Sequence, residues 1–155
     1  MSIIQLHFTQ KIPVPVETAW DYFSDPKNLS KITPPEMNFR ITSEIAKPKT
    51  YAGQMIAYTL TPMLGIRIGW LTEITQVNAP YFFVDEQRKG PYKIWHHEHE
   101  FSEISGGVEM TDRLTYEIPL GFIGDLMNSM MIRKRIEGIF EYRKNVLEKT
   151  FGSMK

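Results

Sequence analysis

Three of the chain's four histidines fall in one short tract, between Trp95 and Phe101. In an extended strand, alternate residues point to the same side, so His97 and His99 share a side with Trp95 and Phe101, while His96 points the other way. The alternation predicts that the aromatic side is buried. An imidazole there can act as acid, base, metal ligand or hydrogen-bonding group.

A second strand is expected to add polar groups to the same buried side. Its even-numbered positions, 108–118, are apolar except for Asp112 and the amphipathic Tyr116. We expect Gly106 and Gly107 to form a two-residue turn between the strands. The resulting register pairs Trp95 with Ile118, His97 with Tyr116, His99 with Leu114, and Phe101 with Asp112.

These buried polar side chains allow a structural and a functional interpretation, because an unpartnered polar group is costly to bury. In the structural one, His97 and Tyr116 bond one another, and Asp112 binds a backbone amide or an arginine. In the functional one, His97, His99, Asp112 and Tyr116 hold the polar head group of a ligand in an apolar pocket.

Metal binding and catalysis are two further alternatives. His97 and His99 lie about 6–7 Å apart along the strand, but Asp112 is expected diagonal to His99, so we assign no metal ligands and expect no cofactor. An enzyme would use His97 or His99 as general acid or base, with Tyr116 or Asp112 as its partner. We assign no catalytic residues, because the chain has no cysteine, no phosphate-binding loop and no cofactor fingerprint.

Other strands and the C-terminal segment are expected to line the same pocket. Tyr58 and Trp70 each alternate with large apolar neighbours. A Lys89–Gly90–Pro91 loop would turn Phe83 and Asp85 inward, opposite His97 and Trp95, and would place Gln87 on the same side. Of the two polar groups we prefer Gln87, because a neutral amide costs less to bury than a carboxylate. The C-terminal segment adds Met127 and Met130, whose flexible thioethers can adapt to a ligand.

The order of elements that must position these residues can be followed along the chain. A strand ends at Pro13, two short helices follow, and the second begins at Asp25 and Pro26. Turn residues divide positions 38–118 into six strands with short, hairpin-like connections. Helical spacing then continues from Phe122 to Leu147. We therefore expect one domain, residues 1–155, of the α+β class: a curved seven-stranded antiparallel sheet wrapped around a long C-terminal helix, with two short helices after strand 1.

Composition excludes several classes of protein. The 155 residues include 18 lysines and arginines against 18 aspartates and glutamates, and 42% are apolar. Balanced charge argues against nucleic-acid binding, and the absence of cysteine excludes disulfide scaffolds and thiol chemistry. We find no signal-peptide pattern and no apolar run long enough to insert stably in a membrane, so we expect a cytoplasmic protein.

Several short motifs resemble one known superfamily over essentially the whole chain. They are Ile12-Pro13-Val14-Pro15 followed by Trp20, Gly90-Pro91-Tyr92, the tract from Trp95 to Phe101, and Tyr116-x-x-Pro119-x-Gly121. The pattern resembles the START-related, birch-pollen-allergen-like helix-grip superfamily (SRPBCC), and within it small bacterial stand-alone members. The resemblance implies a cavity between sheet and helix that holds an apolar or amphipathic molecule, and some branches are polyketide cyclases, dehydratases or hydrolase activators.

The predicted function follows from the buried polar groups and the resemblance together. We expect the protein to bind a small hydrophobic or amphipathic molecule of lipid, polyketide or aromatic type in that cavity. Two alternatives remain: a cyclase- or dehydratase-type enzyme with a pocket histidine as general acid or base, and a protein-interaction module. The predicted ligand-binding residues are Tyr58, Trp70, Gln87, Trp95, His97, His99, Asp112, Tyr116, Met127 and Met130.

Overall fold

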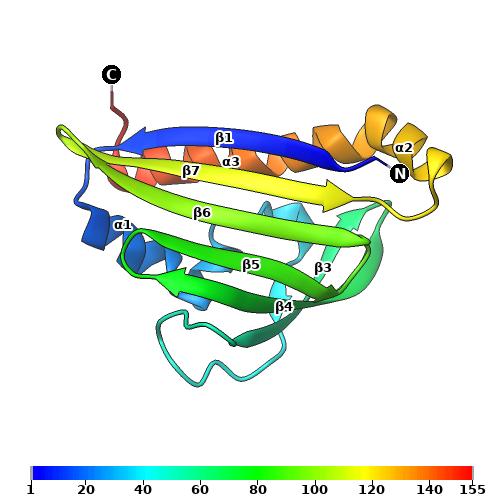
Figure 1. The fold of residues 1–155 in the computed structure, drawn as a ribbon, viewed down its shortest axis with the longest axis horizontal. Coiled ribbons are helices and arrows are strands. Elements are labelled where there is room, and N and C mark those ends of the chain that lie inside the picture. The colour runs from blue at the N-terminus through cyan, green and yellow to red at the C-terminus, as the bar shows by residue number, and fades with distance from the viewer. Residues whose placement is uncertain (1, 155) are drawn as a thin grey trace.

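The sheet and the long helix confirm the predicted α+β helix-grip architecture. A computed structural model describes residues 2–154. Its seven strands form one antiparallel sheet in the order β1-β7-β6-β5-β4-β3-β2, and the long helix runs behind β1 and β7 in Figure 1. The strands are β1 (Ile4–Ile12), β2 (Arg40–Ile41), β3 (Met55–Met63), β4 (Ile66–Asn78), β5 (Phe82–Lys89), β6 (Ile94–Ile104) and β7 (Gly107–Glu117).

The short helices follow β1, as the turn residues predict. Asp25 accepts a hydrogen bond from the backbone N–H of Lys27, and Pro26 occupies the first helical position, but the segment is a 3₁₀ turn and not an α-helix. The helical segments are α1 (Val16–Phe23), the 3₁₀ turns η1 (Pro26–Ser30) and η2 (Pro35–Met37), α2 (Phe122–Met127), the π-turn η3 (Asn128–Ile132) and α3 (Arg133–Phe151). None of the helices among residues 2–154 combines the length and apolar character needed to cross a membrane.

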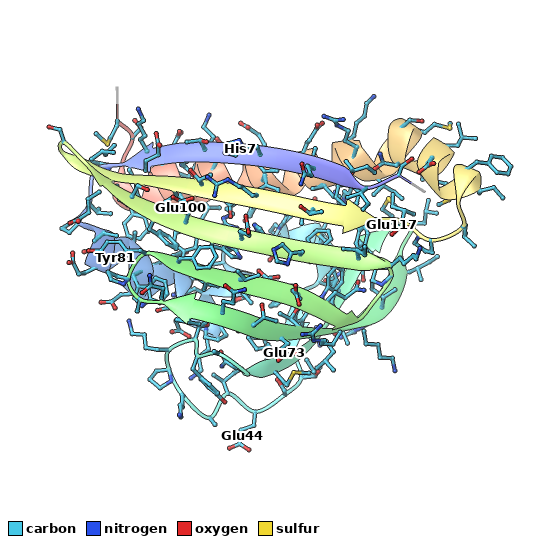
Figure 2. The ribbon with its side chains drawn as sticks, in the orientation of Figure 1. His7, Glu44, Glu73, Tyr81, Glu100 and Glu117 are labelled. Atoms are coloured by element: carbon cyan, nitrogen blue, oxygen red, sulfur yellow. The ribbon has the colours of Figure 1, made fainter. Side chains whose placement is uncertain are left out.

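The C-terminal helix packs its apolar stripe against the concave face of the sheet. Ile132, Ile136 and Leu147 are buried, and Phe140 stacks on Phe8 of β1 with 3.9 Å between ring centroids. The opposite face of the sheet carries polar side chains such as His7 and Glu100 (Figure 2). This division places the functional candidates between the helix and the sheet.

The turn between β6 and β7 lies one residue earlier in the chain than predicted. Ile104 pairs with Gly107, so Ser105 and Gly106 form the turn, and Gly106 has a φ of +81°. Gly107 belongs to β7 and lies so close to β1 that a Cβ there would overlap the backbone oxygen of Ile12. The close approach of β1 therefore requires glycine at position 107.

Because of this turn, the observed register of β6 against β7 differs from the predicted register by two residues. His97 does not face Tyr116, and Phe101 does not face Asp112. A shift of two preserves the buried side but changes every facing pair. The observed pairs are Trp95 with Tyr116, His97 with Leu114, His99 with Asp112, and Phe101 with Met110.

The register of β5 against β6 also differs from the prediction by two residues. Phe83 and Asp85 face the helix side as expected, but Phe83 pairs with His99 and Asp85 with His97. The side chain of Gln87 binds the backbone of the connection between β5 and β6. Its amide N–H donates to the carbonyl of Tyr92 at 2.6 Å, and its amide oxygen accepts from the N–H of Tyr92 at 3.1 Å, so Gln87 holds the connection and not the pocket.

Candidate functional site

A cavity of about 260 Å³ lies between the sheet and the C-terminal helix. Its wall is mostly apolar and aromatic, and Trp70 and Trp95 meet edge to face with 5.2 Å between ring centroids. Across from these rings, Ile136 and Ile139 close the cavity from α3. Apolar walls of this kind exclude water and favour an apolar ligand.

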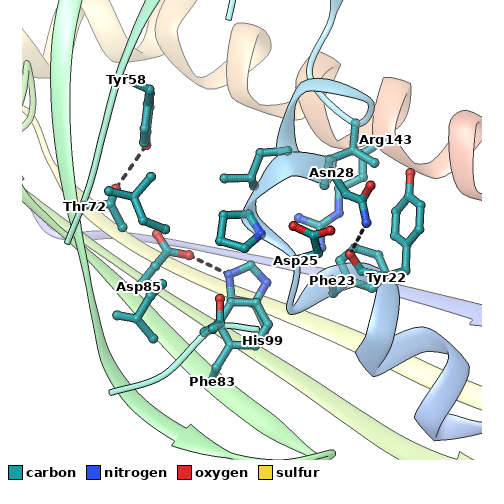
Figure 3. A pocket seen from close by; sticks show the side chains of 16 residues that line it. Tyr22, Phe23, Asp25, Asn28, Tyr58, Thr72, Phe83, Asp85, His99 and Arg143 are labelled. Atoms are coloured by element: carbon teal, nitrogen blue, oxygen red, sulfur yellow. Dashed lines mark hydrogen bonds and ion pairs between the residues drawn. The ribbon is translucent and has the colours of Figure 1, made fainter. Parts of the chain in front are cut away.

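The polar end of the cavity is formed by Asp85, His97 and His99, with Arg143 beside them. A second cavity, of about 70 Å³, adjoins this end and shares Asp85, His99, Arg143 and Tyr58 with the first. Figure 3 shows the side chains around this smaller cavity, with Asp85 and His99 facing one another. The polar groups thus lie where the two cavities meet.

Two carboxylates hold the two imidazoles from opposite sides. Asp85 Oδ2 lies 2.6 Å from Nε2 of His99 and 3.4 Å from Nδ1 of His97. On the other side, Asp112 Oδ1 lies 2.9 Å from Nε2 of His97 and 3.2 Å from Nδ1 of His99, where the geometry of the second contact falls short of a hydrogen bond. All four ring nitrogens of the pair therefore face a carboxylate oxygen.

Arg143 of α3 completes this cluster, which we call the acid–histidine cluster: Asp85, His97, His99, Asp112 and Arg143. Its guanidinium lies 3.3 Å from Asp112 Oδ1, and only 8% of the residue is exposed. The guanidinium carbon also lies 4.8 Å from the ring centroid of Phe23. Arg143 thus supplies a buried positive charge that has both an ionic and an aromatic partner.

The pKa values of the cluster follow from burial and from these partners. Burial opposes ionisation of Asp112, but the charge of Arg143, the hydrogen bond from His97 and the close contact with His99 outweigh it and hold the pKa of this carboxyl well below its ordinary value. For Asp85, burial again opposes ionisation, and the charge of His97 and the hydrogen bond of His99 lower the pKa. Both carboxyl groups are ionised at neutral pH.

The pKa values of the two imidazoles shift in opposite directions. Burial and the charge of His99 lower the pKa of His97. Burial also disfavours the charged form of His99, but the close contact with Asp112 and the hydrogen bond to Asp85 outweigh it and raise the pKa of His99. Of the two imidazoles, His99 is therefore the one that takes up a proton more readily.

The structure brings some of the predicted ligand-binding residues to the cavity wall and places others elsewhere. The predicted residues that line the cavity are Tyr58, Trp70, Trp95, His97 and His99. Asp112 and Tyr116 are buried behind this lining; the hydroxyl of Tyr116 donates to Asn128 Oδ1 at 2.7 Å and not to His97. Gln87 is engaged in its connection, away from the lining.

Met127 and Met130 lie outside the cavity, on the surface of the C-terminal helix. Met130 is 66% exposed and Met127 is 36% exposed. The side of the helix that faces the sheet carries Ile132, Ile136 and Arg143, which follow one another at intervals of four and seven residues. Neither methionine lies on this side. Helical spacing was present in the sequence, but the choice of face was wrong for these two residues.

Two members of the cluster were absent from the predicted site. Arg143 is four residues after Ile139 and seven after Ile136, so its position on the apolar stripe was a signal that the sequence offered. Asp85 was set aside in favour of Gln87 because of the cost of burying a carboxylate. That cost is offset here by two histidines, which the predicted register placed elsewhere.

Comparisons with known proteins identify the fold. No family model matches the sequence, and no curated protein matches it. Among solved structures, protein TTHA0849 from Thermus thermophilus is 17% identical, with a TM-score of 0.74 over 94% of this chain and 95% of that one.

Two further proteins of known structure are also similar. Ginseng major latex-like protein 151 from Panax ginseng is 12% identical, with a TM-score of 0.69 over 96% of this chain and 97% of that chain. Ara h 8.0201 is 14% identical, with a TM-score of 0.60 over 96% and 99% of the two chains. The chain therefore shares the helix-grip fold of these three structures.

Proposed function

We propose that the protein binds a small amphipathic molecule in the cavity of about 260 Å³. The apolar part of this molecule would lie between the rings of Trp70 and Trp95 and the α3 side chains, and its polar group would meet Asp85, His97 and His99. One observation carries the proposal: an aromatic-walled cavity ends in a buried cluster of ionisable groups. Pockets for small molecules combine apolar walls with a few convergent polar groups in this way.

The size of the cavity favours a ligand of one or two rings. An engineered protein cavity of about 150 Å³ accommodates benzene, and the cavity here is less than twice that volume. A bicyclic aromatic molecule or a short branched chain fits this volume. A long acyl chain would need the cavity to extend.

The charges of the cluster disfavour an anionic group on the ligand. Asp85 and Asp112 carry two negative charges beside the single positive charge of Arg143. A ligand anion would add a third negative charge at a buried place, which is costly. A hydroxyl can donate to Asp85 and accept from an imidazole without changing the charge.

Calorimetric titration with 2-naphthol and naphthalene tests both halves of this proposal. We expect both to bind, with 2-naphthol about tenfold tighter, because one hydrogen bond to a charged group contributes about 1.5 kcal/mol. Equal affinities would refute the role of the polar end. If neither molecule binds, the cavity is refuted as a ligand site.

A matched pair of substitutions locates the binding. Ile139→Trp places a large ring in the cavity wall, whereas Ile66→Trp makes the same change at a residue of β4 that is 60% exposed. We expect Ile139→Trp to abolish 2-naphthol binding and Ile66→Trp to leave it unchanged. Retained affinity in Ile139→Trp would place the ligand elsewhere.

A further inference from the structure

We propose that Asp85, His97 and His99 form a binding site for one divalent transition-metal ion, of the zinc or cobalt type, open to the cavity. The site goes beyond the proposed ligand, since it requires only residues of the chain. The sequence analysis assigned no metal ligands, because Asp112 was expected diagonal to His99. In the observed registers Asp112 faces His99, and Asp85 faces His97 on the neighbouring strand.

The donor atoms are close enough to share an ion. One nitrogen from each of His97 and His99 and one oxygen from Asp85 lie within 4.8 Å of one another. Tetrahedral zinc with bonds of about 2.1 Å separates its ligand atoms by about 3.4 Å. The distance from Asp85 Oδ2 to His97 Nδ1 is 3.4 Å, and the 2.6 Å contact with His99 Nε2 must lengthen by about 0.8 Å to reach that separation.

The remaining ring nitrogens are oriented by a second carboxylate. If His97 Nδ1 and His99 Nε2 face the ion, then His97 Nε2 and His99 Nδ1 face Asp112 Oδ1, at 2.9 and 3.2 Å. Imidazoles that bind metal in proteins nearly always donate their other N–H to a carboxylate, a carbonyl or water. One carboxylate here serves both histidines, and Arg143 holds it at 3.3 Å.

Charge also favours a cation at this place. With both imidazoles neutral, Asp85 and Asp112 carry two negative charges against the single positive charge of Arg143. His97, His99 and Asp112 are each less than 8% exposed, so this excess negative charge is poorly compensated by water. A divalent ion bound by Asp85, His97 and His99 supplies positive charge at this place.

Three protein ligands leave one coordination position free. Asp85, His97 and His99 all line the cavity, so that position faces the space between the sheet and α3. Structural zinc sites are closed by four protein ligands, whereas sites with three and an open fourth position accept water or a ligand atom. Two nitrogens and one oxygen suit the borderline ions Zn²⁺ and Co²⁺ better than Ca²⁺ or Mg²⁺, which prefer oxygen.

Titration of the chelator-treated protein with Co²⁺, followed by Zn²⁺, tests the site. We expect one Co²⁺ per chain, with visible absorption bands that Zn²⁺ abolishes by displacement. Failure of the wild-type protein to bind either ion at a 1:1 ratio overturns the proposal. The titration needs no organic molecule, so its outcome is independent of the 2-naphthol experiment.

Variants then identify the ligands. Asp85→Asn and His99→Ala are expected to remove the visible bands, and Asp112→Asn to weaken Co²⁺ binding about 10- to 100-fold by releasing the histidines that it orients. His96→Gln is the matched control, because His96 lies on the same strand but points outward to Glu86 and Glu98. Loss of binding in His96→Gln with retention in His99→Ala would overturn the proposal in favour of a surface site.

Nuclear magnetic resonance of the wild-type protein covers the case in which a buried variant fails to fold. Bound Co²⁺ should strongly shift the imidazole resonances of His97 and His99 and leave that of His7, on the opposite face of the sheet, near its original position. Unshifted His97 and His99 resonances in the presence of stoichiometric Co²⁺ contradict the assignment.

Discussion

Replacing Arg143 by methionine tests whether the acid–histidine cluster depends on the helix for its charge balance. Methionine keeps an unbranched apolar stem against Phe23 and Phe140 but removes the guanidinium. Asp112 then loses its contact of 3.3 Å with a full positive charge and retains only the two histidines. The substitution therefore isolates the charge of Arg143 from most of its packing.

The expected loss of stability is about 3 kcal/mol. Removing one partner of a buried ion pair typically costs about 3–5 kcal/mol, because the other charge stays buried without compensation. The lower end applies here, since His97 and His99 still contact Asp112. Against a total stability of about 5–15 kcal/mol for a domain, this loss is large.

Urea unfolding followed by circular dichroism measures this difference, with Arg113→Met as the matched control. Arg113 is next to Asp112 in β7 and pairs with Glu100, but its side chain is 46% exposed. Exposed ion pairs contribute about 0–1 kcal/mol, so the control should lose less than about 1 kcal/mol. Equal losses in the two variants would refute the reasoning.

A double variant checks the origin of the effect. Asp112→Asn in the Arg143→Met background removes the uncompensated charge, so we expect the two losses to be non-additive by about 1–3 kcal/mol. Strict additivity would mean that the guanidinium stabilises the protein through contacts other than Asp112.

Three further predictions concern the turn, the π-turn and the outer face of the helix. Gly107→Ala should lose roughly 1–3 kcal/mol in urea unfolding, because its Cβ would overlap a backbone oxygen of β1, whereas Gly69→Ala, with open space at its Cβ, should be nearly neutral. Tyr116→Phe removes the hydrogen bond to Asn128 and should cost about 1 kcal/mol, with faster amide hydrogen exchange in η3. Met130→Gln should leave the affinity for 2-naphthol unchanged, because Met130 lies on the exposed side of the helix.

Each of these predictions has a contrary result. Equal stability of the two glycine variants would mean that β1 does not exclude a side chain at position 107. Unchanged exchange in η3 would mean that the Tyr116 hydroxyl does not stabilise the π-turn. Weaker binding of 2-naphthol to Met130→Gln would extend the ligand site onto the outer face of the helix.

The order of elements and the buried side of each strand could be predicted because both depend on local patterns. Alternation from Trp95 to Phe101 identified the buried side of β6, and Asp25 with Pro26 located a helical start. These signals lie within a few residues of the feature they predict. The helix-grip fold follows from their order along the chain.

The contacts within the cluster could not be predicted in the same way, because they depend on packing between distant segments. Gly107, next to the turn, lies against the backbone of Ile12, about 95 residues earlier in the chain. The position of Arg143 beside Asp112 depends on how α3 lies on the sheet. Neither contact can be predicted from the spacing of nearby residues.

A register shift of two residues is the error that alternation cannot detect, and at this site it changes the chemistry. Both registers place His97, His99 and Asp112 on the buried side, so both satisfy the hydrophobic pattern. The predicted register gives a histidine–tyrosine pair with a distant carboxylate, whereas the observed one places each imidazole between two carboxylates. Residue pattern therefore predicts which side chains share a cavity, but turn geometry decides which atoms meet, and a metal site depends on the atoms.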